Sequence, residues 1–483
     1  MNTPLRRLAT LTLVMFIALM GSATWVQFAQ AESLNTDPRN VRTLYREHGN
    51  ARGPIVAGGE VIAESVPVDD AFGYQRVYPF GSLYSAVTGY YSIANGRSQL
   101  ELAENEQLTG RSDQLFFSRI QDLFTGRRPE GATVETTILP AAQQAATDAL
   151  GGQEGAVVAI EPATGRILAL VSTPGFDPNA LASHSTSEAS AQYRALEAAE
   201  GNPLRSKVTQ ERYPPGSTFK LVTAAAALES GQYTAETPVN SPVELALPQT
   251  TATIRNFGGS SCGGDQVSLA EAMRISCNTA FADLGLKLGD DALREQAERF
   301  GFGDPDLRIP MPVVESVFPD DVEGAALAQS AIGQRDVQAT PLQMAMVSAA
   351  IANGGRLMTP HLVSTVRAAD LTVVSATDPE EYSRPLSEAS AAQLTQMMIG
   401  VVDSGTARSA RIPGVQVAGK TGTAQTTEGA PPHAWFTAFA PADAPRVAVA
   451  VIVLNGGDLG NEATGGQVAA PIARSVIEAV LGS

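Results

Sequence analysis

The residues best suited to chemistry lie in the segment PPGSTFK, residues 214–220. The Pro-Pro-Gly run interrupts regular structure and the alanine-rich segment after it favours a helix, so Ser217 is expected at a helix N-terminus. Backbone amides and the helix dipole stabilise a developing alkoxide there. Lys220, one turn further on the same face, can accept the serine proton if a desolvated, cationic neighbourhood lowers its pKa. An isolated Ser-x-x-Lys pair usually marks only a capping serine and a solvated lysine.

Two further motifs remove that isolation. Residues 276–278 read SCN after a helical stretch at 269–274, and residues 420–423 read KTGT at the end of an alternating strand that begins at Val415. Because glycine lacks a side chain, Gly422 is expected to let a ligand approach the backbone. The first two motifs begin 59 positions apart, and the third begins 144 positions after the second. Ser-x-x-Lys, Ser-x-Asn and Lys-Thr-Gly in this order are typical of penicillin-binding proteins and β-lactamases.

The elements that must position these motifs come from both ends of the region after residue 131. Residues 155–160 and 166–171 flank a turn and predict a β-hairpin. Three more strands are expected at 415–424, 434–440 and 447–454, followed by a closing helix within 466–481. Between these groups the sequence favours mostly helix, as at 218–229. The prediction is an α/β fold, one sheet built from both ends with a long helical insertion.

The first thirty residues carry targeting information. Arg6 and Arg7 precede an uncharged stretch over 8–28, which is long enough to span a bilayer core and longer than the apolar part of a cleaved signal peptide. Basic residues before the span favour a cytoplasmic tail at 1–7 and an extracytoplasmic remainder. The sequence thus predicts a single-pass protein of the cell membrane. Cleavage after the Ala29-Gln30-Ala31 pattern is the alternative, and either outcome exports the bulk of the chain.

Composition narrows the function classes. The chain has 483 residues and a formal net charge of -17, which argues against nucleic acid or anionic lipid as a main partner. It has four histidines and two cysteines with no metal-ligand spacing, so neither a metal nor another cofactor is expected. Residues 29–131 show short extended pieces and a turn-like entry at 52–55, with no pattern of a catalytic site. They are predicted to form a smaller N-terminal domain.

Residues 132–483 resemble the transpeptidase domain of class B penicillin-binding proteins, most closely the actinobacterial penicillin-binding protein A group. Besides the three motifs, the resemblance rests on PGFDPN at 174–179, Gly333-Gln334, and HAWF at 433–436. The last two are expected to be structural, shaping a loop and packing the sheet. The resemblance implies a transpeptidase fold shared with serine β-lactamases, with an antiparallel sheet flanked by helices, an all-helical part, and a pedestal or dimerisation domain at 29–131.

The resemblance also implies roles. Ser217 would be acylated by the penultimate D-alanine of a peptidoglycan stem peptide, or by a β-lactam. Lys220 would accept its proton and Ser276 would pass a proton to the leaving amine. The remaining motif residues would bind substrate and adjust the electrostatics: Asn278, Lys420, Thr421, Gly422 and Thr423. The backbone amides of Ser217 and Thr423 would form the oxyanion hole. A membrane glycosyltransferase partner is implied as well.

Rival activities share parts of this pattern. The tetrapeptide STFK, residues 217–220, also resembles class D β-lactamases, but Ser-x-Asn as second motif and the extra N-terminal domain argue against that class. A D,D-carboxypeptidase, which uses water as the acceptor, remains an alternative, as does a non-catalytic β-lactam sensor. A bifunctional class A enzyme is excluded because residues 32–131 are too few for a glycosyltransferase domain.

The two cysteines, Cys262 and Cys277, are expected to pair. An exported chain meets oxidising conditions, and a bridge over 15 positions would stabilise the fold by roughly 3 kcal/mol in the chain-entropy estimate. The bridge would fasten the glycine-rich segment 258–264 beside the Ser-x-Asn motif. The alternative is a small buried Cys277 and an unpaired Cys262.

Overall fold

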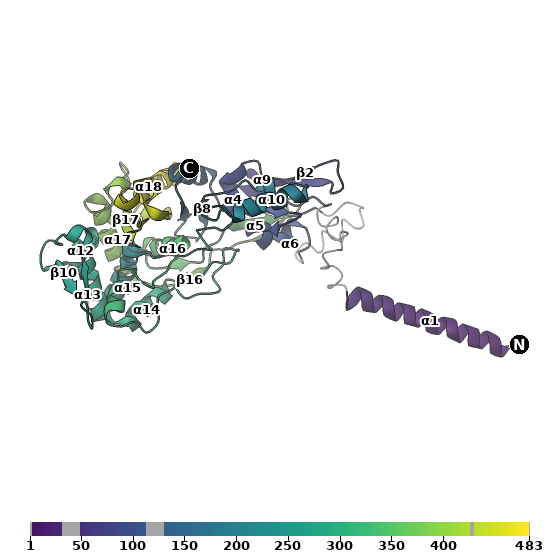
Figure 1. Ribbon diagram of the computed structural model, residues 1–483, viewed down its shortest axis with the longest axis horizontal. Coiled ribbons are helices and arrows are strands. Elements are labelled where there is room, and N and C mark those ends of the chain that lie inside the picture. The colour runs from purple at the N-terminus through teal and green to yellow at the C-terminus, as the bar shows by residue number, and fades with distance from the viewer. Residues whose placement is uncertain (1, 31–48, 113–129, 426–428, 483) are drawn as a thin grey trace.

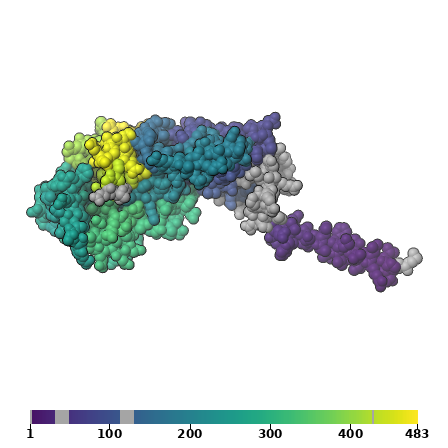
Figure 2. All heavy atoms as spheres, viewed as in Figure 1, coloured from purple at the N-terminus to yellow at the C-terminus, as the bar shows by residue number. Residues whose placement is uncertain are grey.

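The computed structural model describes residues 2–30, 49–112, 130–425 and 429–482. Figure 1 shows two sheet-containing regions along the long axis, with β2 in one and β17 in the other, and helices α12 to α15 below β17. In the space-filling view these regions pack directly against each other (Figure 2). Most of their buried apolar side chains form one continuous hydrophobic cluster that runs from Ile55 to Val480, and a small second cluster holds Tyr90, Phe176 and Leu181.

The region after residue 131 contains the three motifs, and we call it the catalytic region. Its sheet has five antiparallel strands in the order β17-β18-β19-β7-β8. The strands are β7 (Gly155–Ile160), β8 (Ile167–Thr173), β17 (Ala418–Ala424), β18 (His433–Ala440) and β19 (Val447–Val453). Val451 of β19 lies opposite Val157 of β7, so the two ends of the region meet in one sheet, as predicted. β17 forms an edge of this sheet and begins later than its predicted start at Val415.

Helices cover both faces of this sheet, which explains why its central strands β7 and β19 are apolar throughout. α8 (Pro140–Leu150) and α18 (Ala469–Leu481) pack together over one face, while α16 (Pro341–Ala352) covers the other. α17 (Glu388–Asp403) packs against the edge strand β17. The predicted closing helix is α18.

The segment between β8 and β17 is less helical than predicted, and helices make up fewer than half of its residues. Its other helices are α9 (Pro178–Leu181), α10 (Thr186–Glu197), α11 (Lys220–Glu229), α12 (Leu269–Arg274), α13 (Asn278–Leu288), α14 (Asp290–Arg299) and α15 (Gly324–Ser330). Short strand pairs lie between them: β9 (Pro238–Asn240) with β12 (Gln266–Ser268), β10 (Glu244–Ala246) with β11 (Thr253–Arg255), and β13 (Leu357–Met358) with β16 (Glu381–Ser383). Glycine and proline in stretches such as 301–312 interrupt the helices.

The N-terminal region is built on a second sheet, in the order β15-β14-β6-β1-β2-β3. Its strands are β1 (Ile55–Ala57), β2 (Glu60–Pro67), β3 (Tyr74–Val77), β6 (Thr133–Thr136), β14 (Val363–Arg367) and β15 (Val373–Ala376). The last three follow the boundary predicted at residue 131, so the catalytic region completes this sheet. Shorter elements lie between β3 and β6 along the chain: α4 (Ser85–Thr88), β4 (Tyr91–Ser92), β5 (Gly96–Arg97), α5 (Gln99–Ala103) and α6 (Asn105–Leu108). The division at 131 stays a prediction.

The N-terminal helix α1 (Asn2–Phe28) includes the whole predicted span. Within residues 3–28 an 18-residue stretch has a mean hydropathy of 1.8, and by length and composition the helix can cross a membrane. Their side chains are exposed along the helix. Ala31 of the alternative cleavage site lies outside the described residues.

Candidate active site

A tight turn presents Ser217. The serine lies in a 3-10 turn, Gly216–Thr218, directly before α11, which agrees with its predicted place at a helix start. The amide of Gly216 donates to the carbonyl of Gly333 at 2.8 Å, and a Cβ at Gly333 would lie 2.2 Å from the Gly216 oxygen. The indole of Trp435 donates to the carbonyl of Pro214 at 2.9 Å. These contacts hold the turn against the 333 loop on one side and β18 on the other.

Lys220, on the first turn of α11, is fully buried. Its ammonium nitrogen donates to the carbonyl of Ser276 at 2.8 Å, to Ser276 Oγ at 3.2 Å and to Asn278 Oδ1 at 2.7 Å. All three acceptors are uncharged. Burial, and after it the positive charge of Lys420, hold the pKa of Lys220 well below its usual range.

The third motif brings a second buried lysine to the same place. Lys420 on β17 donates to Ser276 Oγ at 2.8 Å and to the carbonyl of Thr421 at 2.9 Å. Burial lowers the pKa of Lys420 to about 7. Within the described chain, neither Lys220 nor Lys420 forms an ion pair, so the hydroxyl of Ser276 lies between two nitrogens that no carboxylate neutralises. Such a group can pass a proton between partners near neutral pH.

The Ser-x-Asn motif lies between two helices. Ser276 has φ +60°, a conformation that is strained for a serine, and α13 begins at Asn278. The helix start has no cap from its own N-cap residue. Asn256 supplies the cap instead, because its Oδ1 accepts from the amides of Asn278 at 2.9 Å and Thr279 at 3.1 Å.

The structure joins Cys262 and Cys277 through a disulfide, in agreement with the predicted pairing. With Asn256, the bridge anchors both ends of the segment 256–262 to the Ser-x-Asn motif. Sequence reasoning did not single out Asn256. An asparagine before a glycine-rich run is too common a pattern to mark a remote helix cap.

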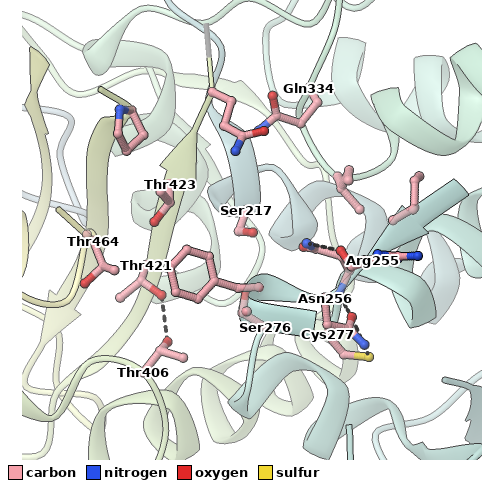
Figure 3. A pocket seen from close by; sticks show the side chains of 18 of the residues that line it. Ser217, Arg255, Asn256, Ser276, Cys277, Gln334, Thr406, Thr421, Thr423 and Thr464 are labelled. Atoms are coloured by element: carbon pink, nitrogen blue, oxygen red, sulfur yellow. Dashed lines mark hydrogen bonds between the residues drawn. The ribbon is translucent and has the colours of Figure 1, made fainter. Parts of the chain in front are cut away.

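A large cavity opens over Ser217, with a volume of about 1410 Å³. Figure 3 shows Ser217 near its centre, with Thr421, Thr423 and Thr464 on one side, Ser276 below and Gln334 above. Thr421 Oγ1 hydrogen-bonds Thr406 Oγ1 at 2.6 Å, so a residue that the motifs do not include holds the motif threonine.

The glycine of the third motif has a packing role that the sequence did not indicate, and its expected contact with a ligand stays a prediction. A Cβ at Gly422 would lie 2.9 Å from the Pro215 oxygen and from Trp435 Cβ. The missing side chain therefore lets β17 pack against the nucleophile turn. Thr421 and Thr423, on either side of Gly422, line the cavity. The expected structural roles of Gly333 and Trp435 agree with their contacts. Gln334 also lines the cavity, which the sequence alone did not indicate.

Comparisons with known proteins agree with this geometry. Residues 155–478 match the penicillin-binding protein transpeptidase domain, and residues 52–134 match the penicillin-binding protein A dimerisation domain. The chain is 47% identical to the peptidoglycan D,D-transpeptidase PbpA of Mycolicibacterium smegmatis, over 100% of this chain and 99% of that protein. It is 46% identical to PbpA of Mycobacterium tuberculosis over the same shares.

Solved structures support the same similarity to penicillin-binding protein A. The ceftriaxone acyl-enzyme of penicillin-binding protein A from M. tuberculosis superposes with a TM-score of 0.88 at 46% identity, covering 90% of this chain and 100% of that one. The penicillin G acyl-enzyme of the same protein gives a TM-score of 0.85 at 47% identity, covering 89% of this chain and 100% of that one. The chain therefore belongs to the penicillin-binding protein transpeptidase family and carries the dimerisation domain of its penicillin-binding protein A members.

Proposed function

We propose that this chain is a membrane-anchored peptidoglycan D,D-transpeptidase that works through an acyl-enzyme on Ser217 and is acylated there by β-lactams. The observation that carries the proposal is the arrangement of Lys220 and Lys420 around Ser276 Oγ, beside Ser217, without a carboxylate among their partners. The named activity of the PbpA relatives supports the reaction, and their β-lactam acyl-enzymes support the inhibition. The mechanism invokes no metal and no cofactor.

In the acylation step, Ser217 Oγ attacks the carbonyl carbon of the penultimate D-alanine and its proton passes to Lys220. Lys220 is suited to this role because its lowered pKa makes it available as a neutral amine. The tetrahedral intermediate then collapses, the peptide bond breaks, and Ser276 delivers a proton to the leaving amine of the terminal D-alanine. The contacts of Ser276 Oγ with both lysines support this relay.

The remaining motif residues bind and polarise the substrate. The backbone amides of Ser217 and Thr423 form the oxyanion hole, which typically supplies the largest electrostatic contribution. Thr421 and Thr423 line the cavity and donate to the substrate carboxylate, and Lys420 adds positive potential. Asn278 holds Lys220 and the substrate amide; its Oδ1 contact at 2.7 Å supports the first part.

An acceptor amine from a second stem peptide then attacks the acyl-enzyme and completes a ping-pong cycle. A D,D-carboxypeptidase would use water at this step, and a β-lactamase would hydrolyse the penicilloyl adduct rapidly. The PbpA relatives, named as transpeptidases, favour the amine acceptor.

Labelling with fluorescent penicillin tests the proposal. The pure protein should form one long-lived adduct that maps to Ser217 by mass, and Ser217→Ala should form none. Ser187→Ala, at an exposed serine on α10, is the matched control and should label normally. Rapid repeated turnover of penicillin would refute the transpeptidase assignment in favour of a β-lactamase.

We also propose that α1 anchors the enzyme with its N-terminus inside and the catalytic region outside. Arg6 and Arg7 before the apolar run support this orientation. A truncation lacking residues 1–28 should be soluble and acylate normally, whereas a folded truncation without penicillin binding would refute a purely anchoring role. Family resemblance supports a membrane glycosyltransferase as partner, and cross-linking in intact cells tests it.

A further inference from the structure

Three glutamines line the cavity on the side that the catalytic motifs leave unassigned. Gln329 lies near the end of α15, and Gln334 and Gln338 follow it in the segment that leads to α16. All three are partly buried. Within the described chain, their side-chain amides make no hydrogen bond, so each has donors and an acceptor available to a molecule in the cavity.

We call these three residues the glutamine wall (Gln329, Gln334 and Gln338). Backbone hydrogen bonds fix its position relative to Ser217. The residue before Gln334 is Gly333, whose carbonyl accepts from the amide of Gly216 at 2.8 Å. Gln334 N donates to the carbonyl of Gln329 at 3.1 Å, and Gln338 pairs through its backbone with Val317. The wall is therefore tied to the turn that carries Ser217. Figure 3 shows Gln334 across Ser217 from Ser276.

The chemistry of the wall suits an uncharged peptide. A primary carboxamide both donates and accepts hydrogen bonds, as a peptide group does. The nearest charges along the wall cancel, because Arg335 pairs with Asp336 at 3.0 Å. The side of the cavity with Thr421 and Thr423 differs, since it offers hydroxyl groups suited to a carboxylate, with the buried Lys420 next to them in β17.

The two sides give a bound peptide a direction. If the terminal carboxylate lies at Thr421 and the scissile carbonyl at Ser217, the chain before the scissile bond must leave the centre away from Thr421. We propose that the glutamine wall is the subsite for that part of the donor stem peptide and binds its backbone amides. This inference rests on the transpeptidase function proposed above.

Two ester donors with the same leaving group test the subsite. The short donor is acetyl-D-alanyl-D-lactate, and the long donor is the amine-blocked stem depsipeptide L-alanyl-γ-D-glutamyl-L-lysyl-D-alanyl-D-lactate. Attack by Ser217 breaks the ester bond, forms the acyl-serine and releases lactate in both cases. The measured quantity is the rate constant for the acyl adduct, followed by mass spectrometry at several donor concentrations.

We expect the wild type to react faster with the long donor, because remote binding energy accelerates the reaction. Gln334→Ala and Gln338→Ala should each slow the long donor by about five- to tenfold, the equivalent of one hydrogen bond, and slow the short donor far less. Gln334→Asn should recover part of the loss if its shorter amide reaches the peptide. Gln192→Ala, an exposed glutamine on α10, is the matched control and should change neither rate.

The outcomes separate the subsite from the function it rests on. Equal losses on both donors would assign the glutamines to support of the nucleophile turn and overturn the subsite, as would no loss on either donor. A wild type that binds penicillin but reacts with neither donor would overturn the proposed transpeptidase function, and the subsite with it.

Discussion

The active site and the N-terminal region both bury positive charge, but with different partners. In the active site, Lys220 and Lys420 are both fully buried and hydrogen-bond only uncharged atoms. In the N-terminal region, Arg52 and Arg76 are also buried, and each donates through Nε to the carboxylate of Glu101, at 2.5 Å and 2.6 Å.

The difference appears in the proton equilibria. Burial lowers the pKa of both lysines, so a neutral amine becomes available near physiological pH. Burial alone would raise the pKa of Glu101, but Arg76 and Arg52 outweigh it and hold that pKa below its usual range. Glu101 therefore stays ionised and its cluster stays charged. Lys220 and Lys420, buried without a carboxylate, form a reactive cluster that can exchange protons. Arg52, Arg76 and Glu101, buried as ion pairs, form a structural cluster.

The largest effect is expected from a substitution in the reactive cluster. Lys220→Ala should slow acylation of Ser217 by penicillin by about 10²–10⁴, the usual contribution of a general base, while the protein remains folded. Stopped-flow acylation kinetics measure this, with thermal unfolding as the check on folding. Lys287→Ala, at an exposed lysine on α13, is the matched control. Acylation at the wild-type rate in Lys220→Ala would show that another group is the base.

A substitution in the structural cluster should change the stability of the protein and not its acylation rate. Glu101→Gln leaves two buried arginines without their carboxylate and should lower the free energy of unfolding by about 3–5 kcal/mol. The acylation rate of the remaining folded protein should not change. Urea unfolding measures the loss, and Glu106→Gln, at an exposed position on α6, is the control. A fall in acylation without a fall in stability would contradict the division between the two clusters.

Removing the disulfide tests whether the active site is stabilised by a covalent bond, as the N-terminal region is stabilised by ion pairs. Cys262 and Cys277 are 15 positions apart, so replacing both with serine should lower the free energy of unfolding by roughly 3 kcal/mol. Protein purified from an exported source and denatured without reductant should take up no alkyl groups, and two after reduction. Alkylation of both cysteines without reduction would refute the bridge in solution.

The two regions also differ in how far their sequences predicted them. The catalytic motifs were recognisable because the chemistry needs particular residue types at short spacings, such as Ser217 and Lys220 on one helical turn. Most of the five-stranded sheet was predictable because its strands are largely apolar runs, whereas β17 was predicted from an alternating pattern. The pairing of Cys262 with Cys277 needed only that the chain be exported and have two cysteines.

The features that sequence reasoning missed depend on distant contacts. Arg52 lies 49 positions before Glu101, and nothing local marks either as half of a buried pair. Asn256 caps a helix that begins 22 positions later. The packing role of Gly422 has the same origin, because the atoms that fill the space beside it belong to the turn that carries Ser217 and to β18. Such contacts follow from the completed fold.

The smallest expected effect is on the pH dependence of stability, where the two clusters should act in different ranges. Lys420 releases its proton at about pH 7 in the folded chain and near 10.5 when unfolded, so between these values the unfolded chain binds more protons. Stability should therefore rise with pH over this range, by at most about 1.4 kcal/mol per pH unit for one proton. Lys220 acts in the same direction.

Glu101 also makes stability rise with pH, but at the acid end of the scale. Its folded pKa is below 4.5, so its contribution is present above that pH and is lost as the pH falls through the folded pKa. Urea unfolding at pH 7, 8 and 9 should thus show a slope that Lys420→Met reduces and Glu101→Gln leaves unchanged. Between pH 5 and 3, the change of stability with pH should be reduced by Glu101→Gln and unchanged by Lys420→Met. A slope above pH 7 that survives Lys420→Met in full would mean that Lys420 stays charged in the folded protein, and the reactive cluster would then resemble the structural one.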